Sequence, residues 1–259
     1  MPTPFYHLSL AKAIVEHPGI SDLSLSSIIE YFPAFLLGHT APDVQTVSGQ
    51  SRESTHFYNL PIQVEDVVPW TAIFISHPSL AGNQINDPEQ VVFIAGYLCH
   101  LLADWFWAGQ IFEPYFGPSA VWKTFRERLY LHNVMRAYFD FQVLATFDGE
   151  VRSGLAAVKP KTWLPFVKVE YLKTWRNFLA GQLQPGAPIQ TVEVFAARQG
   201  ISVEHYYQLL KSEDEMQQQV FDHFPRAHLE NYWRFVMEKS IHLLNKYLTQ
   251  VGGVSNASS

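Results

Sequence analysis

The chain has little that would cross-link it, give it a strong charge or carry it through a membrane. Its 259 residues include one cysteine, Cys99, so no disulfide can form within the chain. Charged residues make up 16%, the formal net charge is −6, and there is no Lys/Arg-rich run, which argues against binding of a nucleic-acid polymer through a basic face. His100 and Asp104 interrupt the apolar stretch from Val91 to Phe106, so it falls short of the roughly 20 apolar residues of a transmembrane segment.

Targeting and linker signals are also scarce. The segment Met1–His7 has neither a basic start nor a long apolar stretch, so no signal peptide is visible and we expect a cytoplasmic protein. No internal repeat or low-complexity tract divides the chain. We therefore expect one domain over residues 1–250 and a disordered tail over residues 251–259, where apolar periodicity ends.

Alternation of polar and apolar residues, the pattern of strands, is scarce, whereas helical periodicity recurs along most of the chain. With 47% hydrophobic and 15% aromatic residues the chain can bury a sizeable core, and we expect an all-α fold, a single compact multi-helix domain. The best-marked helix start is Asp87-Pro88, an N-cap followed by proline at the first helical position. Helices are expected to begin near Leu8, Ser24, Asp66, Pro88, Ser119, Leu164, Thr191, Ser202 and Ala227.

The helix expected from Pro88 contains the most informative polar pair of the chain. His100 and Asp104 are four residues apart in apolar surroundings, so both side chains project from one helix face. Burial of an imidazole or a carboxylate without a partner is unfavourable. For an isolated pair, a hydrogen bond between these two neighbours inside the core would be the favoured interpretation.

Three further residues make the pair part of a larger set. His7, Asp43 and His56 each border or interrupt an apolar segment, and the last two are expected on irregular segments. Irregular segments can bring their side chains to partners on a helix. Five nitrogen and oxygen donors from four segments suit one or two zinc-like ions.

In order and approximate spacing, these segments resemble the ligand framework of bacterial zinc-dependent phospholipases C. The matching segments are His7, Gly38-His-Thr-Ala-Pro-Asp43, Thr55-His56-Phe57 and Gly96-Tyr-Leu-Cys-His100-Leu-Leu-Ala-Asp104. The resemblance covers roughly the first half of the chain. It implies an all-α domain of the phospholipase C/P1 nuclease type, in which zinc ions bind and polarise a phosphodiester and activate water for attack on phosphorus.

The resemblance also implies a role for each matched residue. Asp43, His56, His100 and Asp104 would hold one zinc ion. Asp104 would bridge to a second zinc ion that His7 also binds, and Asp43 would serve as the general base. Mixed histidine and aspartate coordination favours zinc, and manganese or iron is compatible with it.

The sequence departs from the family pattern in two places. The family's processed N-terminal tryptophan, which binds metal through its own amine and carbonyl, has no counterpart in Met-Pro-Thr-Pro-Phe-Tyr before His7. The family's His-x3-Glu helix corresponds best to His132-Asn-Val-Met-Arg136, where arginine replaces the carboxylate. We therefore expect two zinc ions, not three, with His132 still a candidate metal ligand. Arg136 is a candidate for bidentate binding of phosphate, and a helix ion pair with Asp140 is the alternative.

These residues predict a zinc-dependent phosphoesterase whose partner is a small phosphoester or a phospholipid head group. A second interpretation is hydrolysis of a soluble nucleotide or phosphomonoester, because the metal chemistry does not depend on what the phosphate carries. A third is a helical metal-binding interaction domain without catalysis, which the arginine at position 136 favours. The aromatic residues within 105–107 and 112–116 are expected in the core, with the lining of a lipid pocket as the alternative.

Overall fold

The structure is a computed structural model that describes residues 1–147 and 149–255, and within these ranges it is helical with no strand. The expected all-α architecture is therefore confirmed. The α-helices are α1 (Pro4–Val15), α2 (Asp22–Glu30), α3 (Phe32–Gly38), α4 (Gln45–Ser48), α5 (Arg52–His56), α6 (Pro69–Ser76), α7 (Pro88–Trp107), α8 (Glu113–Phe116), α9 (Phe125–Thr146), α10 (Gly149–Ala157), α11 (Val169–Gln182), α12 (Thr191–Gln199), α13 (Val203–Leu210), α14 (Glu213–Met216) and α15 (Arg226–Ser255). Short 3-10 turns are η1 (Ala41–Val44), η2 (Pro78–Leu80) and η3 (Gly82–Gln84), and π-helical turns are η4 (Ala108–Phe112) and η5 (Gln217–Phe221).

Local capping signals account for the helix starts that were predicted correctly. α7 begins at Pro88, where the Asp87 carboxylate accepts a hydrogen bond from the Glu89 backbone amide at 3.0 Å. The starts expected near Ser119 and Leu164 are wrong, because α9 and α11 begin at Phe125 and Val169. In α9 the side chain of Thr124 caps the helix by accepting from the Glu127 amide, a signal closer to the true boundary.

The end of the chain is more regular than expected over part of its length. Helix α15 continues to Ser255, so it extends into the predicted tail of residues 251–259. The remaining residues 256–259 lie outside the described part of the chain.

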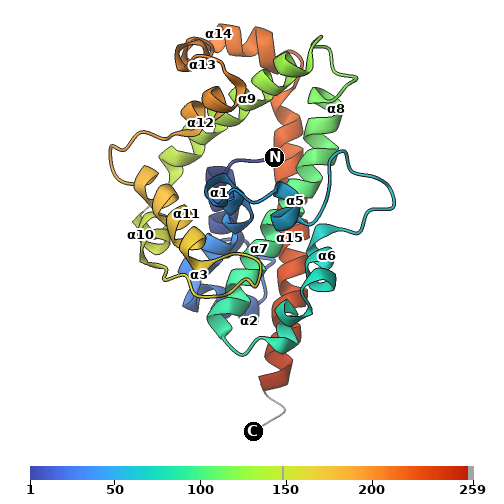
Figure 1. Cartoon of the computed structure of the whole chain (residues 1–259), viewed down its shortest axis with the longest axis vertical. Helices are drawn as coiled ribbons and strands as arrows, with labels where there is room; N and C mark the ends of the chain where they lie inside the picture. The colour runs from blue at the N-terminus through green and yellow to red at the C-terminus, as the bar shows by residue number, and fades with distance from the viewer. Residues whose placement is uncertain (148, 256–259) are drawn as a thin grey trace.

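Helix α7 runs through the middle of the molecule, with α3 and α15 packed against it (Figure 1). By length and composition, the helical stretch Pro88–Phe116 could cross a membrane, with a mean hydropathy of 1.5 over its most apolar window. However, 89% of that window is buried inside the protein. The apolar composition of this stretch is thus explained by its place in the core.

Two glycines allow α3 and α7 to cross closely. A Cβ atom at Gly38 would lie 2.1 Å from the carbonyl oxygen of Phe93, and one at Gly96 would lie 2.4 Å from that of Phe35. No real Cβ atom tolerates such distances, so any larger residue would push the helices apart. This crossing brings the segment after α3 next to His100.

The C-terminal half of the chain is tied to the N-terminus through one buried carboxylate. Asp140 on α9 accepts hydrogen bonds from the hydroxyls of Thr3, the N-cap of α1, and of Thr191, the first residue of α12. The Thr191 bond measures 2.6 Å. Helices α9 and α12 are thereby held over the beginning of α1, on one side of the site described next (Figure 1).

Candidate metal centre

The structure brings together five of the six residues that the sequence suggests as metal ligands. His7 comes from α1, Asp43 from η1, His56 from α5, and His100 and Asp104 from α7. They form two overlapping groups, one of His7, His100 and Asp104 and one of Asp43, His56 and His100, and within each group the potential ligand atoms lie within 4.8 Å of one another. Four of the five side chains are 0–1% exposed, and Asp43 is 19% exposed.

The spacing of the donor atoms fits one metal ion. Ligand atoms on a tetrahedral zinc ion lie about 3.4 Å apart, because each bond measures about 2.1 Å. His56 Nε2 lies 3.4 Å from His100 Nε2, 3.3 Å from Asp104 Oδ2 and 3.8 Å from Asp43 Oδ1. His100 Nε2 lies 3.8 Å from Asp104 Oδ2. These four separations are therefore close to the distance between neighbouring ligand atoms on a tetrahedral zinc ion.

Backbone carbonyls orient two of the histidines. His100 Nδ1 donates to the carbonyl oxygen of His39 at 2.8 Å, and His56 Nδ1 contacts the carbonyl oxygen of Arg52 at 3.2 Å. Because a carbonyl oxygen only accepts, each Nδ1 carries the proton and each Nε2 presents its lone pair to the cluster. Burial lowers the pKa of His100, which keeps this imidazole in the neutral form that binds metal.

The second group contains buried polar atoms without a partner. Both ring nitrogens of His7 and the Oδ1 atom of Asp104 form no hydrogen bond with described residues, although His7 Nε2 and Asp104 Oδ1 are 3.4 Å apart. The His7 ring also stacks on that of His100, with centroids 3.8 Å apart. Each unsatisfied buried group costs about 1–3 kcal/mol. A cation between His7 and Asp104 would satisfy these atoms, so the residues present fit a second ion.

Arg52 belongs to the site although sequence reasoning missed it. Its guanidinium donates to Asp104 Oδ2 at 2.9 Å and to the Tyr58 hydroxyl at 2.5 Å. The available signal is the position of Arg52 in the polar run before His56, and such a run by itself indicates only a loop.

His56 was expected on an irregular segment, but it is the last residue of the short helix α5. The following residue, Phe57, adopts the left-handed conformation with φ 62°, which stops the helix directly after the histidine. Tyr97 on α7 donates its hydroxyl to the Thr55 carbonyl oxygen at 2.5 Å. This bond holds α5 against α7 and so positions the His56 ring. Asp43, also expected on an irregular segment, lies in the 3-10 turn η1.

His132 is in neither group of potential ligands. Its Nε2 accepts a hydrogen bond from the indole N–H of Trp107 at 2.9 Å, so this nitrogen is already occupied. Its Nδ1 has no partner among the described residues. The ring lies at the wall of the adjoining cavity, in contact with Phe112 and Phe116. The geometry thus separates His132 from the five clustered side chains.

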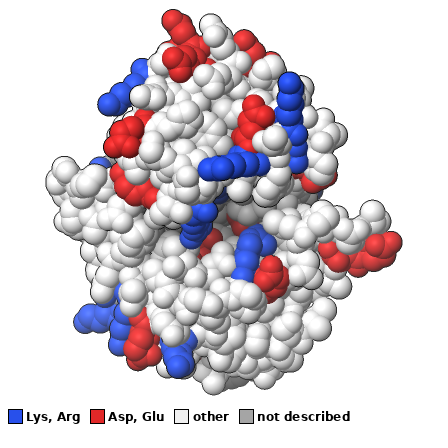
Figure 2. Space-filling view, turned by 45° about the horizontal axis from the view of Figure 1, so that its top comes forward, with Lys and Arg blue, Asp and Glu red and all other residues white. Residues whose placement is uncertain are grey.

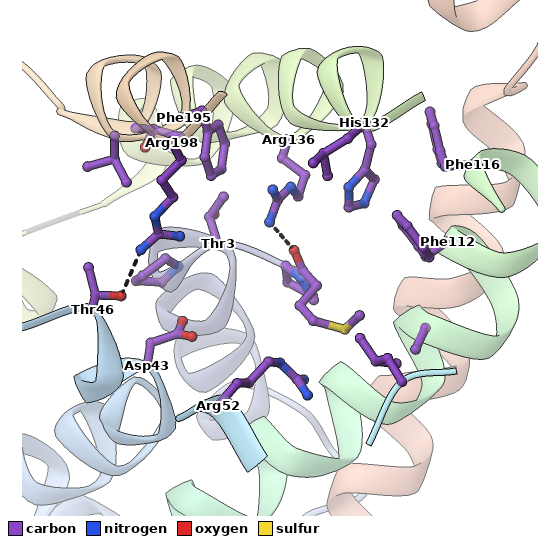
Figure 3. Close-up of a pocket in the computed structure, with 18 of the residues that line it drawn as sticks. Thr3, Asp43, Thr46, Arg52, Phe112, Phe116, His132, Arg136, Phe195 and Arg198 are labelled. Atoms are coloured by element: carbon purple, nitrogen blue, oxygen red, sulfur yellow. Dashed lines mark hydrogen bonds between the residues drawn. The ribbon is translucent and has the colours of Figure 1, made fainter. Parts of the chain in front are cut away.

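A cavity of about 920 Å³ opens beside the cluster. Figure 2 shows a hollow in this face of the molecule, with basic and acidic side chains within and around it. Of the five clustered residues, Asp43 is the one that lines the cavity, and Arg52 lines it next to Asp43 (Figure 3). Asp43 therefore stands between the buried cluster and the space in which a ligand would bind.

The C-terminal half of the chain forms the opposite wall of the cavity. It contributes Arg136 on α9 and Phe195 and Arg198 on α12 (Figure 3). Trp175 on α11 also lines the cavity. Arg136 and Asp140 both lie in the described part of the chain, and they form no ion pair there. Arg136 donates to the carbonyl oxygen of Met1 at 2.6 Å and to Asn133 Oδ1.

The aromatic residues after Asp104 divide between core and cavity. Trp107 is 1% exposed and belongs to the core, as expected. Phe116 is 0% exposed and also belongs to the core, although it borders the cavity. Trp105, Phe106 and Phe112 are partly exposed and line the cavity. The wall facing a ligand is therefore largely apolar next to a polar cluster.

Comparison with known proteins agrees with this geometry. Residues 6–113 match the model of a family described as zinc dependent phospholipase C. No curated protein and no solved structure shows significant similarity to the chain. The matched segment contains His7, Asp43, His56, His100 and Asp104 and ends before His132 and Arg136. Over residues 6–113, which carry all five clustered side chains, the chain is similar to the zinc-dependent phospholipase C family.

Proposed function

We propose that this protein is a zinc-dependent phosphoesterase that hydrolyses a small phosphoester or phospholipid head group bound in the cavity beside Asp43. The observation that carries the proposal is the pair of overlapping His/Asp groups, buried on one side and open to the cavity only at Asp43. A closed structural site would not need a ligand-sized space at its edge.

The donor set suits two zinc ions. Asp43, His56, His100 and Asp104 would hold one, and His7 with Asp104 would hold the other. Bound zinc would neutralise charge on the phosphate and lower the pKa of a water molecule, so that no protein nucleophile is needed. Manganese or iron could occupy the same donors.

Asp43 is suited to accept a proton during hydrolysis. Its carboxylate lies at the boundary between cluster and cavity, and its Oδ1 is 3.8 Å from His56 Nε2. In the metal-free protein, burial raises the pKa of Asp43 above the ordinary aspartate value. We therefore assign it the role of general base. Arg52, held by Asp104, also lines the cavity.

The proposal predicts that Asp43→Asn lowers kcat more than it changes KM, because the carboxylate acts in the chemical step. Loss of a general base typically costs roughly 10²–10⁴-fold in rate. The measurement is steady-state hydrolysis of nitrophenyl phosphoesters by the zinc-loaded full chain, with zinc content determined for each variant. Chelation should abolish the activity and zinc should restore it.

Asp222→Asn is the matched control, since Asp222 is exposed and contacts Gln217, away from the cavity. It should leave kcat and zinc content unchanged. Activity that survives both chelation and Asp43→Asn would contradict the mechanism. Protein that binds two zinc ions but hydrolyses no choline, ethanolamine, nucleotide or aryl phosphoester would support a non-catalytic metal-binding domain.

A further inference from the structure

Two arginines on the wall opposite the metal centre carry charge that no neighbouring carboxylate neutralises by an ion pair. Arg198 donates to the Thr46 hydroxyl at 3.2 Å, and Arg136 donates to the Met1 carbonyl oxygen and to Asn133 Oδ1. All three acceptors are uncharged. Within the described residues neither arginine has a carboxylate oxygen within 4.0 Å, whereas Arg52 across the cavity is paired with Asp104.

The two guanidinium groups lie on one wall and extend into the same space. Figure 3 shows Arg136 from α9 and Arg198 from α12 directed toward the side that carries Asp43 and Arg52, with Phe195 close to both. The Arg136 guanidinium lies over the Phe195 ring at 4.3 Å, which limits its rotation. Its Nε has no acceptor among the described residues. Contacts with Phe195 and Thr46 thus hold the two guanidinium groups in place, and Arg136 Nε is free to donate to a ligand.

We propose that Arg136 and Arg198 form an anion subsite that selects phosphoesters carrying a second anionic group, such as a further phosphate. This inference rests on the proposed function, because it places the reacting phosphate at the metal centre and the second anion at the opposite wall. An anion there would supply the charge-assisted hydrogen bonds that the uncharged acceptors do not. A cationic choline head group would instead face two like charges.

The environment of Arg136 supports this assignment. Burial lowers the pKa of Arg136 to about 10, and the nearby charge of Arg198 adds to the effect. Asp140 and Asp43 oppose it, but Asp140 is already bonded to two hydroxyls and Asp43 belongs to the metal cluster. Two cations close together in a largely apolar cavity are stabilised when an anion binds between them.

Calorimetry with two non-hydrolysable probes tests the subsite independently of catalysis. Propane-1,3-bisphosphonate carries two anionic groups and propylphosphonate carries one. On the zinc-loaded full chain, we expect the bisphosphonate to bind at least about tenfold more tightly, as one charge-assisted contact would provide. Arg198→Gln should remove most of this preference while changing propylphosphonate affinity by less than about threefold. Zinc content is measured after each titration.

Arg234→Gln is the matched control, because Arg234 also donates to an uncharged acceptor, Asn231 Oδ1 at 2.6 Å, but lies on α15 outside the cavity lining. It should retain the full preference. Arg198 is exposed, so its variant is expected to fold, and Arg136→Gln provides a second test. The proposed subsite would be overturned if the wild-type protein bound both probes with equal affinity. It would also be overturned if Arg198→Gln lowered the affinity for both probes by the same factor.

Hydrolysis then separates this inference from the proposed function. Nitrophenyl phosphodiesters whose second arm ends in a phosphate, a methyl or a trimethylammonium group should be hydrolysed in that order of kcat/KM. Diacylglycerol esters with the same head groups, presented in micelles, are compared with the soluble esters to show whether the natural substrate is a lipid or a soluble ester. A preference that depends on Arg198 in either form supports the subsite. A preference for bisphosphonate without any hydrolysis would defeat the proposed function and leave the subsite intact. Hydrolysis without a preference for the anionic substrate would support the proposed function and defeat the subsite.

Discussion

His100 uses its two ring nitrogens for different tasks. Nδ1 is bonded to the His39 carbonyl oxygen, and Nε2 faces both His56 and Asp104. A histidine fixed in this way by a backbone carbonyl presents one tautomer and one direction to a metal ion. His7 differs, since neither of its nitrogens is bonded to a described residue. The two groups of donors therefore differ in how far they are organised without metal.

At this scale we predict that His100→Ala lowers zinc content and the melting temperature. Removing the imidazole shared by both groups should weaken zinc binding by at least about tenfold. Without the cation, the carboxylates of Asp43 and Asp104 would repel each other inside the protein. Metal analysis and thermal unfolding measure the two effects.

The control is His242→Ala, which removes an exposed histidine of α15. It should change neither zinc content nor melting temperature. Unchanged zinc stoichiometry in His100→Ala would count against His100 as a ligand.

At the scale of elements, the crossing of α3 and α7 sets the geometry of the centre. Gly38 and Gly96 permit an approach that any Cβ atom would block. The segment directly after α3 supplies both the carbonyl that orients His100 and, a few residues on, Asp43. Both glycines are visible in the sequence, but only the packing of the helices shows that backbone atoms of Phe93 and Phe35 leave no room for a Cβ atom there.

We predict that Gly96→Ala destabilises the fold by about 1–3 kcal/mol, because its Cβ would lie 2.4 Å from a backbone oxygen and force α3 away from α7. The shift would also carry His39 away from His100, so zinc affinity should fall in parallel. Urea unfolding and zinc titration are the measurements.

Gly181→Ala serves as the control, since a Cβ atom added at Gly181 in α11 would meet no atom within 4 Å. Alanine there should leave stability unchanged or raise it slightly, because it is the better helix former. Equal effects of the two substitutions would show that the close crossing is not what Gly96 serves.

At the scale of the whole molecule, the C-terminal half completes a cavity that the N-terminal half begins. The five clustered side chains all come before residue 105, whereas Arg136, Phe195 and Arg198 come from α9 and α12. Asp140 joins these parts through the hydroxyls of Thr3 and Thr191. Burial raises the pKa of Asp140 to about 7, so the joint itself titrates near neutral pH.

This pKa predicts a pH-dependent stability difference between the wild-type protein and Asp140→Asn. Below about pH 4 the carboxyl is protonated in both the folded and unfolded states. Between about pH 4 and 7 the folded protein retains a proton that the unfolded chain has released, so rising pH disfavours the folded wild type. The free energy of unfolding of Asp140→Asn should therefore increase relative to that of the wild type as the pH rises through this range. The increase should be about 4 kcal/mol at most.

Urea unfolding of both metal-free proteins at pH 5 and pH 7.5 tests this prediction, because the comparison removes the contribution of the histidines. Asp222→Asn, which alters an exposed aspartate, should show a difference from wild type that does not vary with pH. The free energy of unfolding of Asp140→Asn minus that of the wild type should increase with pH, and a signed difference that stays constant or falls would refute the assignment.

Sequence patterns were enough to predict the helical class, the start of α7 and the set of five polar residues in the first half of the chain. Each of these rests on short-range physics: helical periodicity, a capped start at Asp87, and the i, i+4 spacing of His100 and Asp104. His7, Asp43 and His56 were identified because polar residues stood out against apolar neighbours. Such contrasts are visible without knowing the fold.

Sequence patterns did not predict which of the remaining polar residues face the site, because this depends on how the helices pack. His132 was a candidate ligand by spacing, yet its Nε2 is bonded to Trp107 from another helix, while Arg52, in an ordinary polar run, contacts Asp104. Arg198 had no local signal and reaches the cavity through the packing of α12 above the start of α1. The physical reason is that a side chain's partners are set by long-range contacts between helices, which local periodicity does not encode.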